Sequence, residues 1–238
     1  MEYVIIIVLM LFTILILKIG LDIKIKNIKK VKELGYDEKT NKILKHFPDN
    51  SIICKNILEM LDNKDVKIEE VQDEKSTTSL YMVMQNKILI GNVKDSFARI
   101  QTIAHECIHS IQNKTLLKFN FIISNVNIIY FVIVCILALF NVVNKEVGNI
   151  LLIGLILMQF IFFTVRSFLE IDAMTRAEFL AKDYIDKTKL LSKTDAKTIE
   201  NKYKEINKVG IKLYTFTLAC QAMIKPIIYC ISLLLRNH

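Results

Sequence analysis

The chain has 238 residues, of which 53% are hydrophobic and 24% are charged, and its formal net charge is +8. A soluble domain of this length carries fewer apolar residues, so the composition argues against an ordinary soluble globular protein and places the apolar excess in a membrane. The lysines are interleaved with acids and lack an aromatic stacking pattern, so the positive charge does not indicate a nucleic-acid-binding protein.

The first predicted element is an apolar helix over Tyr3 to Leu21, which is long enough to cross roughly 30 Å of hydrocarbon. Only Lys18 interrupts it, and a lysine near a helix end can extend its ammonium to the lipid headgroups. The segment lacks the basic start and the cleavage site of a signal peptide. We therefore expect a membrane anchor that is retained.

Residues 22 to 118 are expected to form a first cytosolic region with a small α+β fold. Ser51 is the expected N-cap of a helix over Ile52 to Leu61. After a charged loop, Ser79 to Met84 and Lys87 to Gly91 have the apolar character of two short strands.

The helix that follows the strands carries the HExxH pattern, in the stretch from Ala104 to His109. Its apolar residues recur at helical spacing up to about Gln112, and Asp95 or Ser96 is the expected cap. The chain has only 4 histidines, so the pattern rarely arises by chance at this composition. The alternative is a surface helix with a fortuitous histidine pair.

The spacing of this pattern suits metal-dependent hydrolysis. Residues four apart share a helix face, so His105 and His109 can bind one metal ion. Glu106 lies next to the first histidine and points toward the water on that metal. Zinc lowers the pKa of such a water toward neutrality, and Glu106 would accept its proton as a general base.

A catalytic zinc site needs a third protein ligand and an open fourth position. Two classes of soluble zincin supply it as a histidine six residues after the second one, but Thr115 occupies that position here. The other histidines, His46 and His238, are remote in the sequence. We therefore expect an acidic ligand from a second helix on the same side of the membrane.

Two uncharged apolar runs, Phe119 to Val143 and Val147 to Val165, follow the HExxH helix. Only three residues separate them, so they predict a tight transmembrane helical hairpin. A buried hairpin in a large soluble core is the alternative, but two uncharged runs of this length rarely occur there.

The helix expected after the hairpin contains the candidate acidic ligand, Glu170. At 3.6 residues per turn this residue shares a face with small and apolar side chains, which would let the helix approach the HExxH helix closely. Asp172 would instead pair with Arg176 on the solvent side. A salt bridge to Arg166 is the alternative role for Glu170, and Asp172 is the next candidate ligand.

The fourth predicted span, Leu213 to Leu235, is the weakest, because it contains Lys225 and Pro226. Basic residues stay on the cytoplasmic side of a membrane. They are frequent directly after the first span and throughout residues 166 to 212, whereas the hairpin tip carries only Lys145. Both soluble stretches are therefore expected in the cytosol and both termini outside, and attraction to anionic lipid accounts for the net charge.

Two of these motifs resemble those of the membrane-bound neutral zinc metallopeptidases of bacteria. One is Ala-His-Glu-x-x-His-x-x-Gln from Ala104 to Gln112, and the other is Glu-x-Asp-Ala-x-x-Arg-Ala from Glu170 to Ala177. The order of spans and motifs is also similar, and the resemblance covers most of the chain from about Tyr81 onward. The chain departs from the family at Ile108, where glycine is usual, and at Ser110, where alanine is more usual.

The resemblance implies a gluzincin-like site in which His105, His109 and Glu170 bind zinc and Glu106 is the general base. The HtpX and CAAX-protease group is similar in its third ligand and in its placement of spans between the motifs. It normally has an aspartate where this chain has Met174, so it ranks second.

Together these observations predict a mainly α, integral membrane protein with about four transmembrane helices and a small cytosolic α+β, zincin-like catalytic region. The expected parts are an anchor (1–21), a cytosolic region with the HExxH helix (22–118), a transmembrane hairpin (119–165), a cytosolic helical region (166–212) and a last span (213–238).

The expected function is that of a zinc-dependent endopeptidase at the cytosolic face of the cell membrane. It would act on peptides or membrane proteins, with membrane-protein quality control as one setting. A zinc-binding sensor or scaffold is the alternative. Lys225 and Pro226 suggest a small transporter as a third, but we expect instead that Leu213 to Ile224 lies partly at the membrane interface. Glu106 favours hydrolysis, because a purely structural zinc site is closed by a fourth ligand and needs no base.

Overall fold

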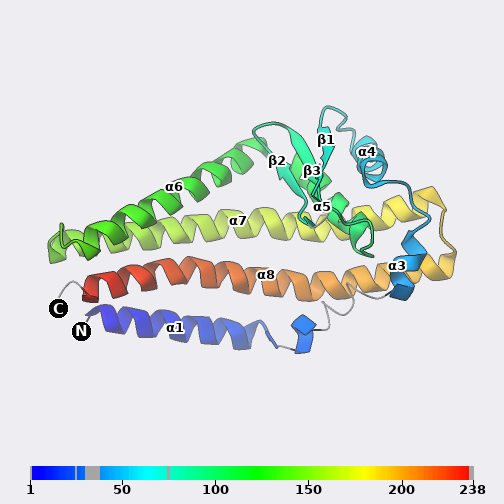
Figure 1. Cartoon of the computed structure of the whole chain (residues 1–238). Helices are drawn as coiled ribbons and strands as arrows, with labels where there is room; N and C mark the ends of the chain where they lie inside the picture. The colour runs from blue at the N-terminus through cyan, green and yellow to red at the C-terminus, as the bar shows by residue number, and fades with distance from the viewer. Residues whose placement is uncertain (1, 25, 30–37, 74–75, 236–238) are drawn as a thin grey trace. The chain divides into compact units, whose positions relative to one another are not determined.

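The computed structural model describes residues 2–24, 26–29, 38–73 and 76–235, and Figure 1 labels their helices and strands. Part of the lysine-rich segment after the first span, and His238, lie outside these residues. The chain divides into two compact units. The span unit comprises Met1–Ile23, Phe119–Phe168 and Lys212–His238, and the site unit comprises Lys24–Lys118 and Leu169–Ile211.

Four helices are long and apolar enough to cross a membrane: α1 (Glu2–Gly20), α6 (Lys114–Leu139), α7 (Lys145–Thr188) and α8 (Lys193–Leu235). This confirms the four apolar helices expected from the sequence. Many of their large apolar side chains are exposed, above all in α1, where only Tyr3 is buried. Such faces need an apolar environment outside the chain.

The helices α7 and α8 are longer than the predicted spans. Figure 1 shows α7 as one uninterrupted helix. The prediction that a new helix starts near Glu170 is therefore wrong, because Glu170 lies within α7. No glycine or proline follows Gly154 within α7, so nothing in the sequence interrupts the backbone hydrogen bonds there. The helix α8 is also continuous, although it contains Pro226.

In the span unit, the four helices meet at one end in a single apolar cluster. The hydroxyl of Tyr3 in α1 donates to Asn149 Oδ1 in α7 at 2.8 Å, and the hydroxyl of Tyr229 in α8 donates to the Gly148 carbonyl at 3.2 Å. The start of α1, the start of α7 and the end of α8 therefore lie together. The cluster consists of Tyr3, Val134, Ala138, Leu152, Leu155, Tyr229, Cys230 and Leu233.

The site unit contains a three-stranded sheet in the order β1-β3-β2, formed by β1 (Lys67–Glu70), β2 (Leu80–Met82) and β3 (Lys87–Ile90). The two predicted strands are present as β2 and β3, which pair antiparallel. The strand β1 pairs parallel with β3, so the prediction of a charged loop there is wrong. Because β1 is an exposed edge strand with Ile68 as its one apolar residue, it lacks the alternation that reveals a strand in sequence.

The helix α4 (Asn50–Met60) starts differently from the prediction. Asp49, and not Ser51, occupies the cap position, and it makes no side-chain cap hydrogen bond. Its carboxylate pairs instead with Lys94 at 2.9 Å. The Ser51 backbone N–H donates to the Glu70 carboxylate at 2.9 Å. A carboxylate from β1 thus satisfies an N–H at the start of α4, which sequence spacing does not reveal.

The helix α5 (Arg99–Ile111) carries the HExxH pattern. It begins later than predicted, with Ala98 in the cap position. Neither Asp95 nor Ser96 caps it, but the Ser96 hydroxyl accepts the Ala98 N–H at 3.2 Å just before the helix starts. Its apolar face packs in the core of the site unit with α4, β3 and the part of α7 that belongs to this unit. Buried side chains of this core include Ile53, Ile57, Ile88, Ile90, Ile100, Ala104, Cys107, Ala173, Ala177, Ala181 and Tyr184.

Candidate metal centre

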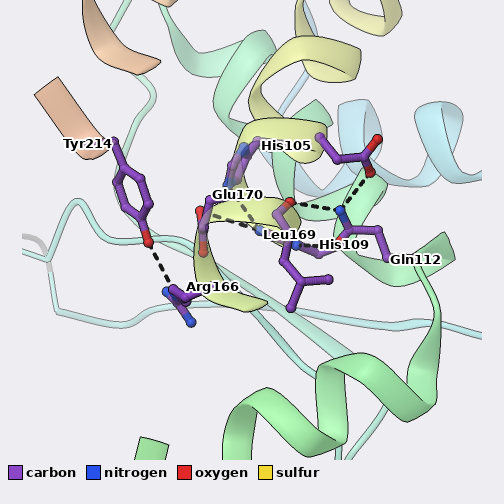
Figure 2. A network of polar contacts seen from close by, with 8 residues as sticks. His105, His109, Gln112, Arg166, Leu169, Glu170 and Tyr214 are labelled. Atoms are coloured by element: carbon purple, nitrogen blue, oxygen red, sulfur yellow. Dashed lines mark hydrogen bonds and ion pairs between the residues drawn. The ribbon is translucent and has the colours of Figure 1, made fainter. Parts of the chain in front are cut away.

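The two histidines of α5 and Glu170 of α7 converge in the site unit, as Figure 2 shows. The Nε2 atoms of His105 and His109 are 3.1 Å apart. The Glu170 Oε2 atom lies 3.4 Å from the first of these nitrogens and 3.8 Å from the second. Among the described residues, these three form the one group of histidine, cysteine, aspartate and glutamate side chains that could hold a metal ion.

The distances between these donor atoms fit a tetrahedral zinc ion. With zinc bonds of roughly 2.0–2.1 Å, neighbouring donors in a tetrahedron lie about 3.3 Å apart. The three observed separations of 3.1, 3.4 and 3.8 Å lie around that value. Two imidazoles and one carboxylate are also a donor set of catalytic zinc sites. The residues present therefore fit a zinc ion.

Packing places Glu170 at this site. Glu170 is buried, and so are Ala173, Ala177 and Ala181 on the same side of α7. These alanines belong to the core that also contains the apolar side of α5. Their small side chains allow two helices to approach closely, as the helical spacing predicted.

The surroundings of His109 shift its affinity for a proton. Burial lowers the pKa of His109, but the hydrogen bond and the negative charge of Glu170 raise it by more, so the net shift is upward. In the metal-free protein Glu170 therefore stabilises the charged imidazole, and a metal ion must displace that proton to bind.

Glu106 is buried beside the histidine pair. Burial raises the pKa of its carboxyl, while the charges of His105 and His109 and a backbone hydrogen bond from Tyr81 lower it by less. Tyr81 belongs to β2, which is an edge strand of the sheet. Glu106 therefore lies between the candidate metal ligands and the edge of the sheet, with a carboxyl that binds protons more readily than an exposed glutamate.

Gln112, at the C-terminal end of α5, connects the two helices of the site (Figure 2). Its Oε1 atom lies 2.7 Å from His109 Nδ1. Its Nε2 atom donates to the Leu169 carbonyl at 2.8 Å and to Asp172 Oδ2 at 2.7 Å. The amide thus contacts a metal-ligand candidate on α5 and two residues close to Glu170 on α7, one before it and one two positions after it.

These contacts determine the tautomer of His109. The Gln112 amide nitrogen donates to two oxygen atoms, which fixes the orientation of the amide. Its Oε1 atom therefore faces His109, and because an amide oxygen only accepts, Nδ1 of His109 must carry the proton. The Nε2 lone pair then faces Glu170 and His105, where a metal ion would bind.

Sequence reasoning assigned no role to Gln112 and treated Asp172 as a solvent-side residue. The predicted pair of Asp172 with Arg176 is present at 3.4 Å, but Asp172 also accepts from Gln112. A sequence signal for Gln112 existed, because a residue three positions after His109 lies on the same helix face.

The structure also describes the other residues that the sequence suggested for this region. Arg166 donates its Nε to the Tyr214 hydroxyl at 3.0 Å within the span unit (Figure 2), and its salt bridge to Glu170 stays a prediction. Asp172 is not in the metal-ligand group. His46 is exposed and is not in that group either.

Comparisons with family models, with curated proteins and with solved structures found no match to this chain. The interpretation of the site therefore depends on its own geometry and chemistry.

Proposed function

We propose that this chain is a zinc-dependent endopeptidase that is inserted in the cell membrane through four helices and has its site on the cytosolic side. The observation that carries the proposal is the convergence of His105, His109 and Glu170 beside the buried Glu106. The resemblance of the two motifs to those of membrane-bound zinc metallopeptidases also supports it.

His105, His109 and Glu170 would hold the zinc ion. Three protein ligands leave one position open, which a catalytic site requires and a structural site does not. When bound, zinc supplies Lewis acidity, which makes a water molecule more acidic and polarises a carbonyl group. In the neutral imidazole of His109, Gln112 places the proton on Nδ1, so the Nε2 lone pair is the one that serves this ligand role.

Glu106 has the position and the basicity of the general base. It is adjacent to the ligand pair but is not in the metal-ligand group. Its raised pKa brings proton transfer closer to neutral pH, where a base is most effective. Glu106 would remove a proton from the attacking water and then deliver it to the leaving amine of the peptide.

The edge strand β2 supports a peptide as the substrate. An extended peptide can add to the edge of a sheet through backbone hydrogen bonds. In the order β1-β3-β2, one side of β2 is not paired with another strand, and its Tyr81 backbone hydrogen-bonds Glu106. A peptide that pairs with β2 would therefore bring its backbone carbonyls near the base.

The span unit supports the membrane topology. The start of α1, the start of α7 and the end of α8 share one end of this unit. A chain that crosses four times, with both termini and the hairpin tip on one side of the membrane, requires this arrangement. The excess of lysine and arginine in residues 166–212 over the hairpin tip assigns the opposite side to the cytosol.

Replacement of Glu106 by glutamine tests the proposal. Glu106→Gln keeps the shape of the side chain and removes its basicity, so cleavage by the zinc-loaded protein should fall by roughly a hundredfold to ten-thousandfold. The assay is cleavage of a broad peptide library and of an unfolded membrane protein by purified protein in lipid nanodiscs, with zinc measured on the same samples.

The zinc content of Glu106→Gln should equal that of the wild type, whereas His105→Ala and Glu170→Ala should each lose most of the metal. Equal cleavage by the wild type and by Glu106→Gln would exclude the general-base role. A fully zinc-loaded wild type that cleaves no peptide would instead favour a zinc-binding sensor or scaffold.

A further inference from the structure

A polar cluster lies within the apolar helices of the span unit. It joins Asn127 of α6, Gln159 of α7 and Lys225 of α8, and we call it the Lys225 cluster. The Lys225 ammonium donates to Asn127 Oδ1 at 2.9 Å, and Gln159 Nε2 donates to the same oxygen at 2.6 Å. Asn127 and Gln159 are buried, and Lys225 is partly buried.

The hydrogen bonds of this cluster are incomplete. Within the part of the chain that the structure describes, the Nδ2 atom of Asn127 and the Oε1 atom of Gln159 are buried without a hydrogen-bond partner. Exchanging the oxygen and nitrogen of the Asn127 amide does not satisfy these atoms. It would turn the Asn127 nitrogen toward two donors, Lys225 Nζ and Gln159 Nε2. The cluster therefore contains one unused donor and one unused acceptor, both enclosed by protein, so its polar groups only partly satisfy one another.

The charge of Lys225 is also uncompensated within the described residues. Among those residues its ammonium has no ion pair with a carboxylate; it contacts the neutral Asn127 Oδ1 atom at 2.9 Å and the Phe162 ring, whose centroid is 5.8 Å away. A charged side chain inside a membrane span is costly and is usually retained for function. A negative group at this position would offset that cost.

The depth of Lys225 indicates where this negative group comes from. Lys225 lies about twelve residues after Leu213 and about ten before Leu235, which is roughly 18 Å and 15 Å along the helix. It is thus near the middle of the proposed span, too deep for a lysine to reach lipid phosphates readily. One turn further along α8, Ile228 is exposed, so the surface beside Lys225 can accept another apolar helix.

We propose that the Lys225 cluster binds an acidic side chain carried within the apolar transmembrane helix of a substrate or partner protein. The carboxylate would accept a hydrogen bond from the partly buried Lys225 ammonium, which also donates to Asn127 Oδ1. This inference rests on the proposed membrane insertion and is independent of the proposed peptidase activity.

The test measures helix association in phosphatidylcholine nanodiscs. The probes are three labelled single-span peptides rich in leucine, whose central residue is aspartate, asparagine or leucine. Energy transfer reports their binding to labelled Glu106→Gln protein, which keeps the peptides intact. We expect the aspartate peptide to bind at least tenfold more tightly than the other two.

Lys225→Met should reduce binding of the aspartate peptide at least tenfold, to the level of the asparagine peptide, whereas Lys225→Arg should retain it. Lys18→Met, which removes a lysine near the end of α1, is the matched control and should leave binding unchanged. Helical content by circular dichroism and a single elution peak in detergent report whether each variant is folded.

Equal binding of the three peptides, or binding that is insensitive to Lys225→Met in a folded variant, would overturn the proposal. Competition by phosphatidylglycerol that depends on Lys225 would also overturn it, in favour of a lipid phosphate. Loss of cleavage in the peptidase assay leaves these outcomes unaffected, so the two proposals fail separately.

Discussion

At the residue scale, Gln112 is the side chain whose role the tertiary contacts reveal most clearly. Its Oε1 atom accepts a hydrogen bond from the N–H at His109 Nδ1. Its Nε2 atom donates to Leu169 and Asp172, which lie on either side of Glu170 in the sequence. One amide thus orients a ligand on α5 and the backbone beside a ligand on α7. Partners of this kind contribute to metal affinity although they do not touch the metal.

We predict that Gln112→Ala lowers zinc affinity by about tenfold to a hundredfold, the usual effect of removing such a partner. Competition with a chromophoric chelator measures it. Gln112→Glu should recover part of the loss, because a carboxylate still accepts the His109 proton. Gln85→Ala, which changes an exposed glutamine in the turn before β3, should have no effect. Wild-type affinity in Gln112→Ala would show that packing alone orients His109.

At the element scale, the approach of α7 to α5 depends on small residues. Ala173, Ala177 and Ala181 are buried in the core of the site unit, on the same side of α7 as Glu170. Close packing leaves no room there for a longer side chain. The position of the acidic ligand is therefore a consequence of how the two helices pack.

We predict that Ala177→Leu destabilises the protein by about 1–3 kcal/mol, because it overpacks this core. Since the added bulk separates α7 from α5, zinc content should fall as well. Thermal unfolding in detergent and metal analysis measure the two effects. Phe179→Ala changes an exposed position two residues away and should stay within about 0.5 kcal/mol of the wild type. Full zinc content in Ala177→Leu would contradict this account of the helix spacing.

At the scale of the whole molecule, the candidate site draws on two segments that a helical hairpin separates in the sequence. The site unit combines Lys24–Lys118 with Leu169–Ile211, and residues 119–168 belong to the span unit. Under the proposed membrane insertion, both parts of the site unit must therefore lie on the same side of the membrane. A hairpin that crosses twice meets this requirement.

We predict that single cysteines introduced at Met84 and at Leu190, both exposed in the site unit, are protected from an impermeant thiol reagent in intact cells. A cysteine at Val142, which is exposed at the hairpin tip, should be labelled. The wild-type chain, labelled in parallel, provides the background from its own cysteines. Labelling at Met84 but not at Leu190, or the reverse, would refute the shared topology.

The sequence by itself determined the features that depend on neighbouring residues. The facing of His105 and His109 follows from their spacing of four in a helix, and the four apolar helices follow from continuous runs of apolar residues. Glu170 could be named as a ligand candidate because it shares a helix face with the alanines. The sequence could not decide between Glu170 and Asp172 as the acidic ligand, because that requires the position of α5.

The tertiary structure decided the features that join distant segments. The strand β1 exists because β3 offers it a partner, although its own residues are mostly charged. The contacts of Gln112 with α7 and the Lys225 cluster each join residues that lie tens of positions apart. Helical periodicity reports which face a side chain occupies, whereas only the packing of elements determines what that face meets.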